Sequence, residues 1–71
     1  MQYKNRVLSV GIRITQLRIE RKMSQRELGF RSGTEGSFIC RIEKGRTDSK
    51  ISTLCKIADA LDVPVSYFFT D

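Results

Sequence analysis

The sequence predicts an all-α protein of five helices in one domain. Apolar residues recur at the helical period in several segments, no segment alternates apolar and polar residues as a half-buried strand does, and no internal repeat is present. The 71 residues have room for one domain (residues 1–71), and much of the 39% hydrophobic content must be used in its core.

The first helix is predicted over residues 8–22. Val10, Ile14 and Leu17 fall at positions i, i+4 and i+7, which places them on one face of a helix. Residues 1–7 precede this pattern, and we expect them to form an N-terminal arm.

The second helix is predicted to begin at Ser24 and to end at Gly33. The stretch from Ser24 to Glu27 has the spacing of a capping box, in which the serine hydroxyl accepts from the backbone of Glu27 and the glutamate reaches back. Gly33 can take the left-handed conformation that ends a helix at low steric cost. Leu28 and Gly29 are expected to face inward.

The third helix is predicted to open at Thr34 or Glu35 and to stop at Gly45. A polar and basic loop follows it over residues 46–49. This helix contains the apolar residues Phe38, Ile39 and Ile42 at positions i, i+1 and i+4. We expect Ile39 and Ile42 to face the core.

The fourth helix is predicted from Lys50 to a point near Asp62, with Ser49 or Asp48 as its N-cap. Because the single proline disfavours helical geometry at the residue before it, we expect a turn and then a last short helix over residues 66–69. The apolar stripe of the fourth helix consists of Ile51, Leu54, Ile57, Ala58 and Leu61.

The charge is unevenly distributed along the chain. The formal net charge is +5, and twelve of the thirteen Lys and Arg lie in residues 1–50, beside five acidic residues. Residues 51–71 carry one Lys and three Asp. A basic balance of this kind indicates an anionic partner, but a solvated basic surface explains the charge alone equally well.

Residue types of common catalytic and metal sites are missing from the sequence. There is no histidine, and Cys40 and Cys55 are too far apart for a CxxC redox or zinc pair. No nucleophile–base pairing or phosphate-binding glycine loop is visible either. We therefore predict that the protein is not an enzyme, binds no cofactor or metal, and keeps both thiols reduced and inert.

The sequence contains no run of about 18 apolar residues that could span a bilayer, and no signal-peptide core. We expect a cytoplasmic location and no membrane partner.

Two short helices joined by a tight turn form the helix-turn-helix arrangement, whose second helix enters the DNA major groove. The residues that match a known family run through most of the chain and are Gly11, Arg13-Ile14, Leu17-Arg18, Ser24-Gln25, Glu27-Leu28, Ser32-Gly33, Ile39, Arg41 to Gly45, Leu54, Lys56 to Ala58, Ala60-Leu61 and Val63. With these residues the sequence resembles the Cro and lambda-repressor (XRE-type) helix-turn-helix family, with small restriction-modification controller proteins and phage repressors among its members. The resemblance implies the lambda-repressor-like five-helix fold, with residues 24–44 as the helix-turn-helix.

The resemblance implies that four residues of the third helix face DNA bases: Glu35, Gly36, Ser37 and Arg41. Arg41 can donate two hydrogen bonds to guanine O6 and N7, worth about 1–3 kcal/mol of discrimination, although phosphate binding or a surface ion pair is the alternative. Ser37 either bonds a base or phosphate, or caps its own helix.

Glu35 and Gly36 depart from the pattern expected of a base-reading helix. A carboxylate facing DNA is repelled by phosphate unless it accepts from cytosine N4 or interacts with its own helix N-terminus. Gly36 costs about 1 kcal/mol of helix propensity relative to alanine. It either lets the backbone approach the duplex closely or loosens the turn.

Contacts with the DNA backbone are implied at two places. Ser24 and Gln25 begin the second helix, where backbone amides and the positive end of the helix dipole suit a phosphate oxygen. For Gln25 the alternative is a plain solvent-exposed side chain. Lys44, Arg46 and Thr47 lie at the end of the third helix and in the next loop, where family members hold the backbone.

The resemblance also implies a largely buried ion pair between Arg18 and Glu43, which joins the first helix to the third. Gly29 stands where the family usually has alanine, consistent with a close approach of the second and third helices. Phe30 is expected on the outer face of the second helix.

The C-terminal segment, residues 63–71, carries more apolar surface than a short helix can bury alone. Related small repressors dimerise through this segment, and a symmetric dimer would set two recognition helices about 34 Å apart. The alternative is that these side chains close the core of the monomer. We expect a mixture, in which Val65 and Phe68 face inward and Tyr67 or Phe69 lies partly at the interface. The residues assigned to the dimer interface are Val63, Val65, Tyr67 and Phe69.

These observations predict a DNA-binding transcriptional regulator that acts as a homodimer on a pseudo-palindromic operator. Autoregulation of a restriction-modification or phage-type operon is one expectation, and no small-molecule ligand is expected. The alternative is an antitoxin-like protein-interaction module with secondary DNA binding, which the C-terminal aromatic residues would suit. RNA binding is disfavoured because no surface of stacking aromatic residues is indicated.

Overall fold

Four α-helices and one 3₁₀ helix make up the computed structural model, which describes residues 3–69. No strand occurs in this part of the chain, so the all-α prediction is confirmed. The prediction of five α-helices is wrong in its last element, which is the 3₁₀ helix. In chain order the elements are α1 (Tyr3–Glu20), α2 (Gln25–Arg31), α3 (Gly36–Glu43), α4 (Ile51–Leu61) and η1 (Val65–Phe69).

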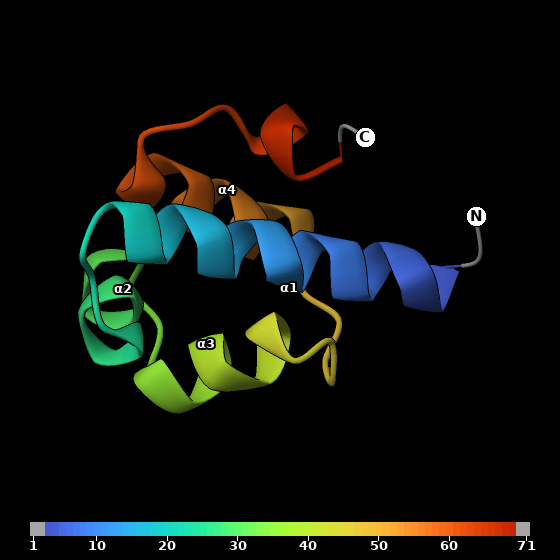
Figure 1. Cartoon of the computed structure of the whole chain (residues 1–71), viewed down its shortest axis with the longest axis horizontal. Helices are drawn as coiled ribbons and strands as arrows, with labels where there is room; N and C mark the ends of the chain where they lie inside the picture. The colour runs from blue at the N-terminus through green and yellow to red at the C-terminus, as the bar shows by residue number, and fades with distance from the viewer. Residues whose placement is uncertain (1–2, 70–71) are drawn as a thin grey trace.

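α1 crosses the middle of the molecule (Figure 1). α2 and α3 lie on one side of it, and α4 and η1 lie on the other. Within residues 3–69 the helices are too short or too polar to cross a membrane. The core between the elements consists of Val10, Ile14, Leu17, Leu28, Ile39, Ile42, Leu54, Ile57, Ala58, Leu61 and Phe68.

The N-terminal end of α1 lies earlier than the sequence predicts. The helix begins at Tyr3 instead of residue 8, so residues 3–7 are helical and do not form an arm, while residues 1–2 lie outside the described part of the chain. Half-buried Val7 continues the apolar face of the helix by one more turn, which explains the longer helix.

α2 begins at a side-chain cap, as predicted. Ser24 is the N-cap, and its Oγ accepts a hydrogen bond of 2.9 Å from the backbone N–H of Glu27. The Glu27 carboxylate turns instead to Arg31, whose Nη2 lies 2.6 Å from Oε2. Gly33 follows the helix with a φ of 72°, the left-handed conformation predicted for it.

The start of α4 differs from the prediction in two ways. Lys50 is the N-cap and makes no side-chain cap hydrogen bond, so the expected cap by Ser49 or Asp48 is wrong. The buried Ser49 Oγ has no hydrogen-bond partner among residues 3–69. Ile51, expected in the buried stripe, is 63% exposed.

η1 is a 3₁₀ helix because its backbone hydrogen bonds span three residues. The N–H of Tyr67 donates to the carbonyl of Pro64 at 3.0 Å, which is the i to i+3 pattern. η1 buries Phe68 in the core, as predicted, and leaves Tyr67 and Phe69 exposed. This segment is therefore divided between the core and the surface.

Candidate nucleic-acid interface

α3 turns one face to the core and the opposite face to solvent. Ile39 and Ile42 are buried, whereas Ser37, Arg41 and Lys44 are exposed. The exposed residues fall at i, i+4 and i+7, so their side chains share one side of the helix. This arrangement gives α3 a polar and cationic outer face, called here the reading face (Ser37, Arg41 and Lys44).

Arg41 lies at the centre of the reading face. Its guanidinium carbon is 5.9 Å from the centroid of the Phe38 ring, a cation–π contact. The ion pairs found among residues 3–69 do not include Arg41. A cation–π contact at an exposed site contributes only about 0.5–1 kcal/mol, so the guanidinium can exchange it for a stronger anionic or base partner.

Glu35 and Ser37 occupy the N-terminal end of α3. Glu35, and not Ser37, is the N-cap residue, and its side chain makes no cap hydrogen bond. The Ser37 hydroxyl donates to Glu35 Oε2 at 3.5 Å, the outer limit of a hydrogen bond. Both side chains are exposed and weakly held, so both are available to an external partner.

Gly36 has a role that the sequence does not indicate. A Cβ atom at this position would lie 3.0 Å from the Cα of Arg26 and 3.2 Å from its backbone nitrogen. The missing side chain therefore points at α2, not at solvent, and its absence lets the first turns of the two helices pack closely. Gly29 acts in the same contact from α2, because its Cβ would lie 2.5 Å from the carbonyl carbon of Glu35.

The C-terminal end of α3 is fixed by a buried ion pair. Arg18 Nε lies 2.6 Å from Glu43 Oε2, Nη2 lies 3.1 Å from Oε1, and the two side chains are only 15% and 6% exposed. Arg18 also donates from Nη1 to the carbonyl of Met23 at 2.8 Å. The pair therefore ties α1 to both the last turn of α3 and the segment that enters α2.

Gly11 lets α1 and α3 meet at the same place. A Cβ there would clash with the backbone carbonyl oxygen of Ile42 and would lie 2.8 Å from that of Glu43. No signal in a single sequence distinguishes this close approach from an ordinary helix glycine. α2 thus fixes the N-terminal end of α3, and α1 fixes its C-terminal end. The side chains of the reading face take no part in either contact.

Gln25 is neither free nor fully exposed. It is half-buried, and its Nε2 donates to Glu43 Oε1 at 3.0 Å. One N–H of the amide is used in this bond, and the second N–H and the carbonyl oxygen remain for another partner. Glu43 therefore orients the residue that opens α2, while Ser24 beside it uses its hydroxyl in the helix cap.

Positive charge continues past the end of α3. Lys44 and Arg46 are exposed, and Gly45 between them has a φ of 69°, which turns the chain toward α4. Thr47 is half-buried, and its Oγ1 donates to the carbonyl of Asp48 at 3.3 Å. Arg26, exposed on α2 beside Gly36, adds a cation that sequence reasoning missed because its nearness to α3 depends on tertiary packing.

The residues assigned to a dimer interface lie in two environments. Val63 and Val65 are half-buried and pack against the core. Tyr67 and Phe69 are exposed, and the Tyr67 ring lies 5.3 Å from the Arg13 guanidinium carbon. Only the two aromatic residues present substantial surface.

Cys40 and Cys55 are free and half-buried. No group of three or more His, Cys, Asp or Glu side chains able to hold a metal ion occurs among residues 3–69.

The chain is similar to known transcriptional regulators. It is 40% identical over 62 residues to an uncharacterized transcriptional regulator in the ATPase CF(0) region of Rhodospirillum rubrum, covering 87% of this chain and 57% of that protein. It is 37% identical over 59 residues to the immunity repressor protein of Bacillus phage phi105, covering 83% of this chain and 41% of the repressor. The chain thus spans about half the length of these two relatives.

A solved structure shares the arrangement of the helices. The restriction-modification controller protein C.AhdI from Aeromonas hydrophila matches with a TM-score of 0.86 and 30% identity, over 89% of this chain and 96% of the controller. The model of the helix-turn-helix family matches residues 14–68. The chain therefore belongs to the XRE-type helix-turn-helix family, which confirms the resemblance seen in its sequence.

Proposed function

We propose that this protein is a sequence-specific DNA-binding transcriptional regulator that inserts α3 into the major groove. The observation that carries the proposal is the reading face, the polar and cationic side of α3. This short helix is held by α2 at its N-terminal end and by α1 at its C-terminal end. The wide major groove of B-DNA admits an α-helix, and base edges there present distinct hydrogen-bonding patterns. The named relatives, a phage immunity repressor and a restriction-modification controller, support this assignment.

Arg41 is the principal base-reading residue of the proposal. Its guanidinium leaves the Phe38 ring and donates two hydrogen bonds to O6 and N7 of a guanine. Ser37 bonds a neighbouring base or phosphate, and Glu35 accepts from cytosine N4, an amino group that donates in the major groove. We assign no base to the side-chain position of Gly36, because it faces α2.

Backbone phosphates are held from the two ends of the helix-turn-helix. Lys44, Arg46 and Thr47 contact one phosphate stretch, and the N-terminal end of α2, with Ser24 and Gln25, contacts another. These contacts set the depth and direction of α3. Each neutralised phosphate steepens the dependence of log K on log salt by about 0.9.

The full regulator acts as a homodimer on a pseudo-palindromic operator in the cytoplasm, and controls its own operon. Half-sites one helical turn apart, about 34 Å, would receive the two α3 helices. Of the residues assigned to the interface, Tyr67 and Phe69 make the contact between the two subunits, because Val63 and Val65 are half-buried and pack against the core.

Selection from a random duplex library tests the proposal. We expect the wild-type chain to enrich a two-fold symmetric sequence and to bind it at least about a thousandfold more tightly than a scrambled duplex at physiological salt. Fluorescence anisotropy at low and physiological salt measures both affinities. Failure to form a complex with any duplex at low salt would overturn the proposal.

A further inference from the structure

Position 36 of α3 has no side chain, and the backbone of Arg26 lies where such a side chain would point. A Cβ on Gly36 would be 3.0 Å from the Cα of Arg26 and 3.2 Å from its backbone nitrogen. Gly36 comes directly before Ser37, the first residue of the reading face. The side chain of Arg26 therefore leaves α2 beside the N-terminal end of that face.

The contact between α2 and the start of α3 follows one edge of α2. Gly29 comes three residues after Arg26 and is therefore its neighbour on the helix surface. A Cβ on Gly29 would lie 2.5 Å from the carbonyl carbon of Glu35 and 2.6 Å from the nitrogen of Gly36. Because Gly29 is buried and Arg26 is exposed, Arg26 occupies the solvent side of this edge.

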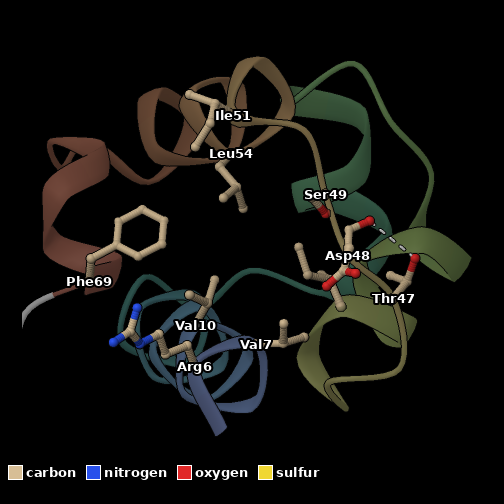
Figure 2. A pocket seen from close by; sticks show the side chains of 10 residues that line it. Arg6, Val7, Val10, Thr47, Asp48, Ser49, Ile51, Leu54 and Phe69 are labelled. Atoms are coloured by element: carbon tan, nitrogen blue, oxygen red, sulfur yellow. Dashed lines mark hydrogen bonds between the residues drawn. The ribbon is translucent and has the colours of Figure 1, made fainter. Parts of the chain in front are cut away.

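The Arg26 guanidinium belongs to none of the ion pairs found among residues 3–69. Glu27, the acidic residue next to it in the chain, is already paired with Arg31 at 2.6 Å. Arg6 has different surroundings, because it lines an apolar groove between α1, the α3–α4 loop, α4 and η1 (Figure 2). Figure 1 places α4 and η1 across α1 from α2 and α3. Arg26 thus offers an unpaired guanidinium at the start of the reading face.

A guanidinium at this place has two kinds of target on a duplex. A phosphate contact carries no sequence information, whereas a bidentate contact with O6 and N7 identifies a guanine. The close packing at Gly36 favours the base. No side chain of α3 occupies position 36, and that of Arg26 starts from the space that one would fill.

We propose that Arg26 replaces the side chain that position 36 lacks and donates two hydrogen bonds to O6 and N7 of a guanine next to the base contacted by Ser37. The inference deepens the proposed function and rests on it, because it requires α3 in the major groove. It makes Arg26 a specificity-determining residue that α2 supplies. Each half-site then contains two guanines contacted by arginine, one by Arg26 and one by Arg41.

The two guanines have an expected separation. Gly36 and Arg41 are five residues apart in α3, a distance of about 7.5 Å along an α-helix. Successive bases of one strand are about 3.4 Å apart. If α3 lies along the groove, the two contacts are therefore about two base pairs apart.

Selection from a random duplex library tests the assignment. The wild type should enrich two guanine positions in each half-site. Arg26→Ala should lose one of them and keep the other, and Arg41→Ala should do the reverse. Arg26→Lys keeps the charge but lacks the planar fork of donors, so it should also show a weaker preference at the Arg26 position.

Fluorescence anisotropy then measures how strongly each variant prefers the selected operator to a scrambled duplex. For Arg26→Ala the ratio of the two affinities should fall at least about fivefold for each half-site. Arg31→Ala is the matched control, because it removes one arginine from the same helix and Arg31 is held by Glu27. The control should leave the ratio unchanged, and both variants should keep the helical circular dichroism spectrum of the wild type.

A change in the DNA tests the same contact from the other side. 7-Deazaguanine has a carbon in place of N7 and cannot accept one of the two hydrogen bonds. At the position assigned to Arg26, it should weaken binding of the wild type and leave binding of Arg26→Ala unchanged.

Three results overturn the inference: Arg26→Ala keeps every selected position, it weakens operator and scrambled duplex alike, or 7-deazaguanine weakens the wild type and Arg26→Ala equally. Each removes Arg26 from base reading and leaves the proposed role of α3 intact. A wild type that binds no duplex at low salt rejects the proposed function, and the inference with it.

Discussion

Arg18 and Glu43 form a two-point ion pair that joins α1 to the last turn of α3, with 2.6 Å between Nε and Oε2. The same carboxylate accepts a hydrogen bond from Gln25 at the start of α2. One buried group therefore sets the relative positions of the three helices that form the helix-turn-helix and its support.

Glu43→Ala is expected to lower the free energy of unfolding by about 3–5 kcal/mol, because it leaves the guanidinium of Arg18 buried without its partner. Urea denaturation followed by circular dichroism measures the loss. Glu20→Ala is the control, since Glu20 is exposed and its contact with Arg21 is 3.5 Å long, and it should change stability by less than about 0.5 kcal/mol. Similar small losses for both variants would contradict the structural role of the pair.

Gly11→Ala should destabilise the fold even though alanine is the better helix former. Propensity alone favours the change by about 1 kcal/mol. Its Cβ would meet the backbone carbonyls of Ile42 and Glu43, however, and overpacking against such a contact typically costs about 1–3 kcal/mol or more. Thermal unfolding compares it with Gln16→Ala, an exposed position on the same helix. A higher melting temperature for Gly11→Ala would show that α1 and α3 are not in close contact.

Arg41→Ala is expected to reduce sequence preference. If Arg41 reads a guanine, the variant loses about 1–3 kcal/mol for each half-site of the selected operator and little on a scrambled duplex. Lys44→Ala should weaken both duplexes alike, because a phosphate contact carries no sequence information. Lys56→Ala, an exposed cation on α4, controls for the loss of one charge. Equal losses on both duplexes for Arg41→Ala would reject its role in reading bases.

The salt dependence of binding should report the number of phosphate contacts. On a duplex that carries a single half-site, Lys44→Ala and Arg46→Ala should each reduce the slope of log K against log salt by about 0.9, and the double variant by about 1.8. Anisotropy titrations at four salt concentrations give the slopes. An unchanged slope in the double variant would place both side chains away from the DNA backbone.

Element types were predictable from the sequence because their signals are local. The cap at Ser24 and the left-handed turn at Gly33 each depend on a few neighbouring residues, and the structure shows both. The start of α1 lies earlier than the spacing of Val10, Ile14 and Leu17 predicts, because Val7 continues the apolar face by one more turn toward the N-terminus.

Contacts between helices were harder to predict from the sequence. Periodicity assigns Ile51 to the apolar stripe of α4, but it does not say which part of that stripe another element covers. The packing role of Gly36 could not be predicted either, because a single sequence does not show which atoms a side chain at that position would meet. The outer positions of α3 were easier to assign, since the burial of Ile39 and Ile42 fixes the face on which Ser37 and Arg41 emerge.

The separation between the reading face and the supports of α3 has an evolutionary consequence. Ser37 and Arg41 contribute nothing to the contacts of Gly11, Gly36 and Glu43 that hold the helix. If α3 reads bases as proposed, paralogous copies can diverge in their target sequences through a few outward substitutions, without compensating changes in the framework. The same independence makes this small scaffold suitable for retargeting by design.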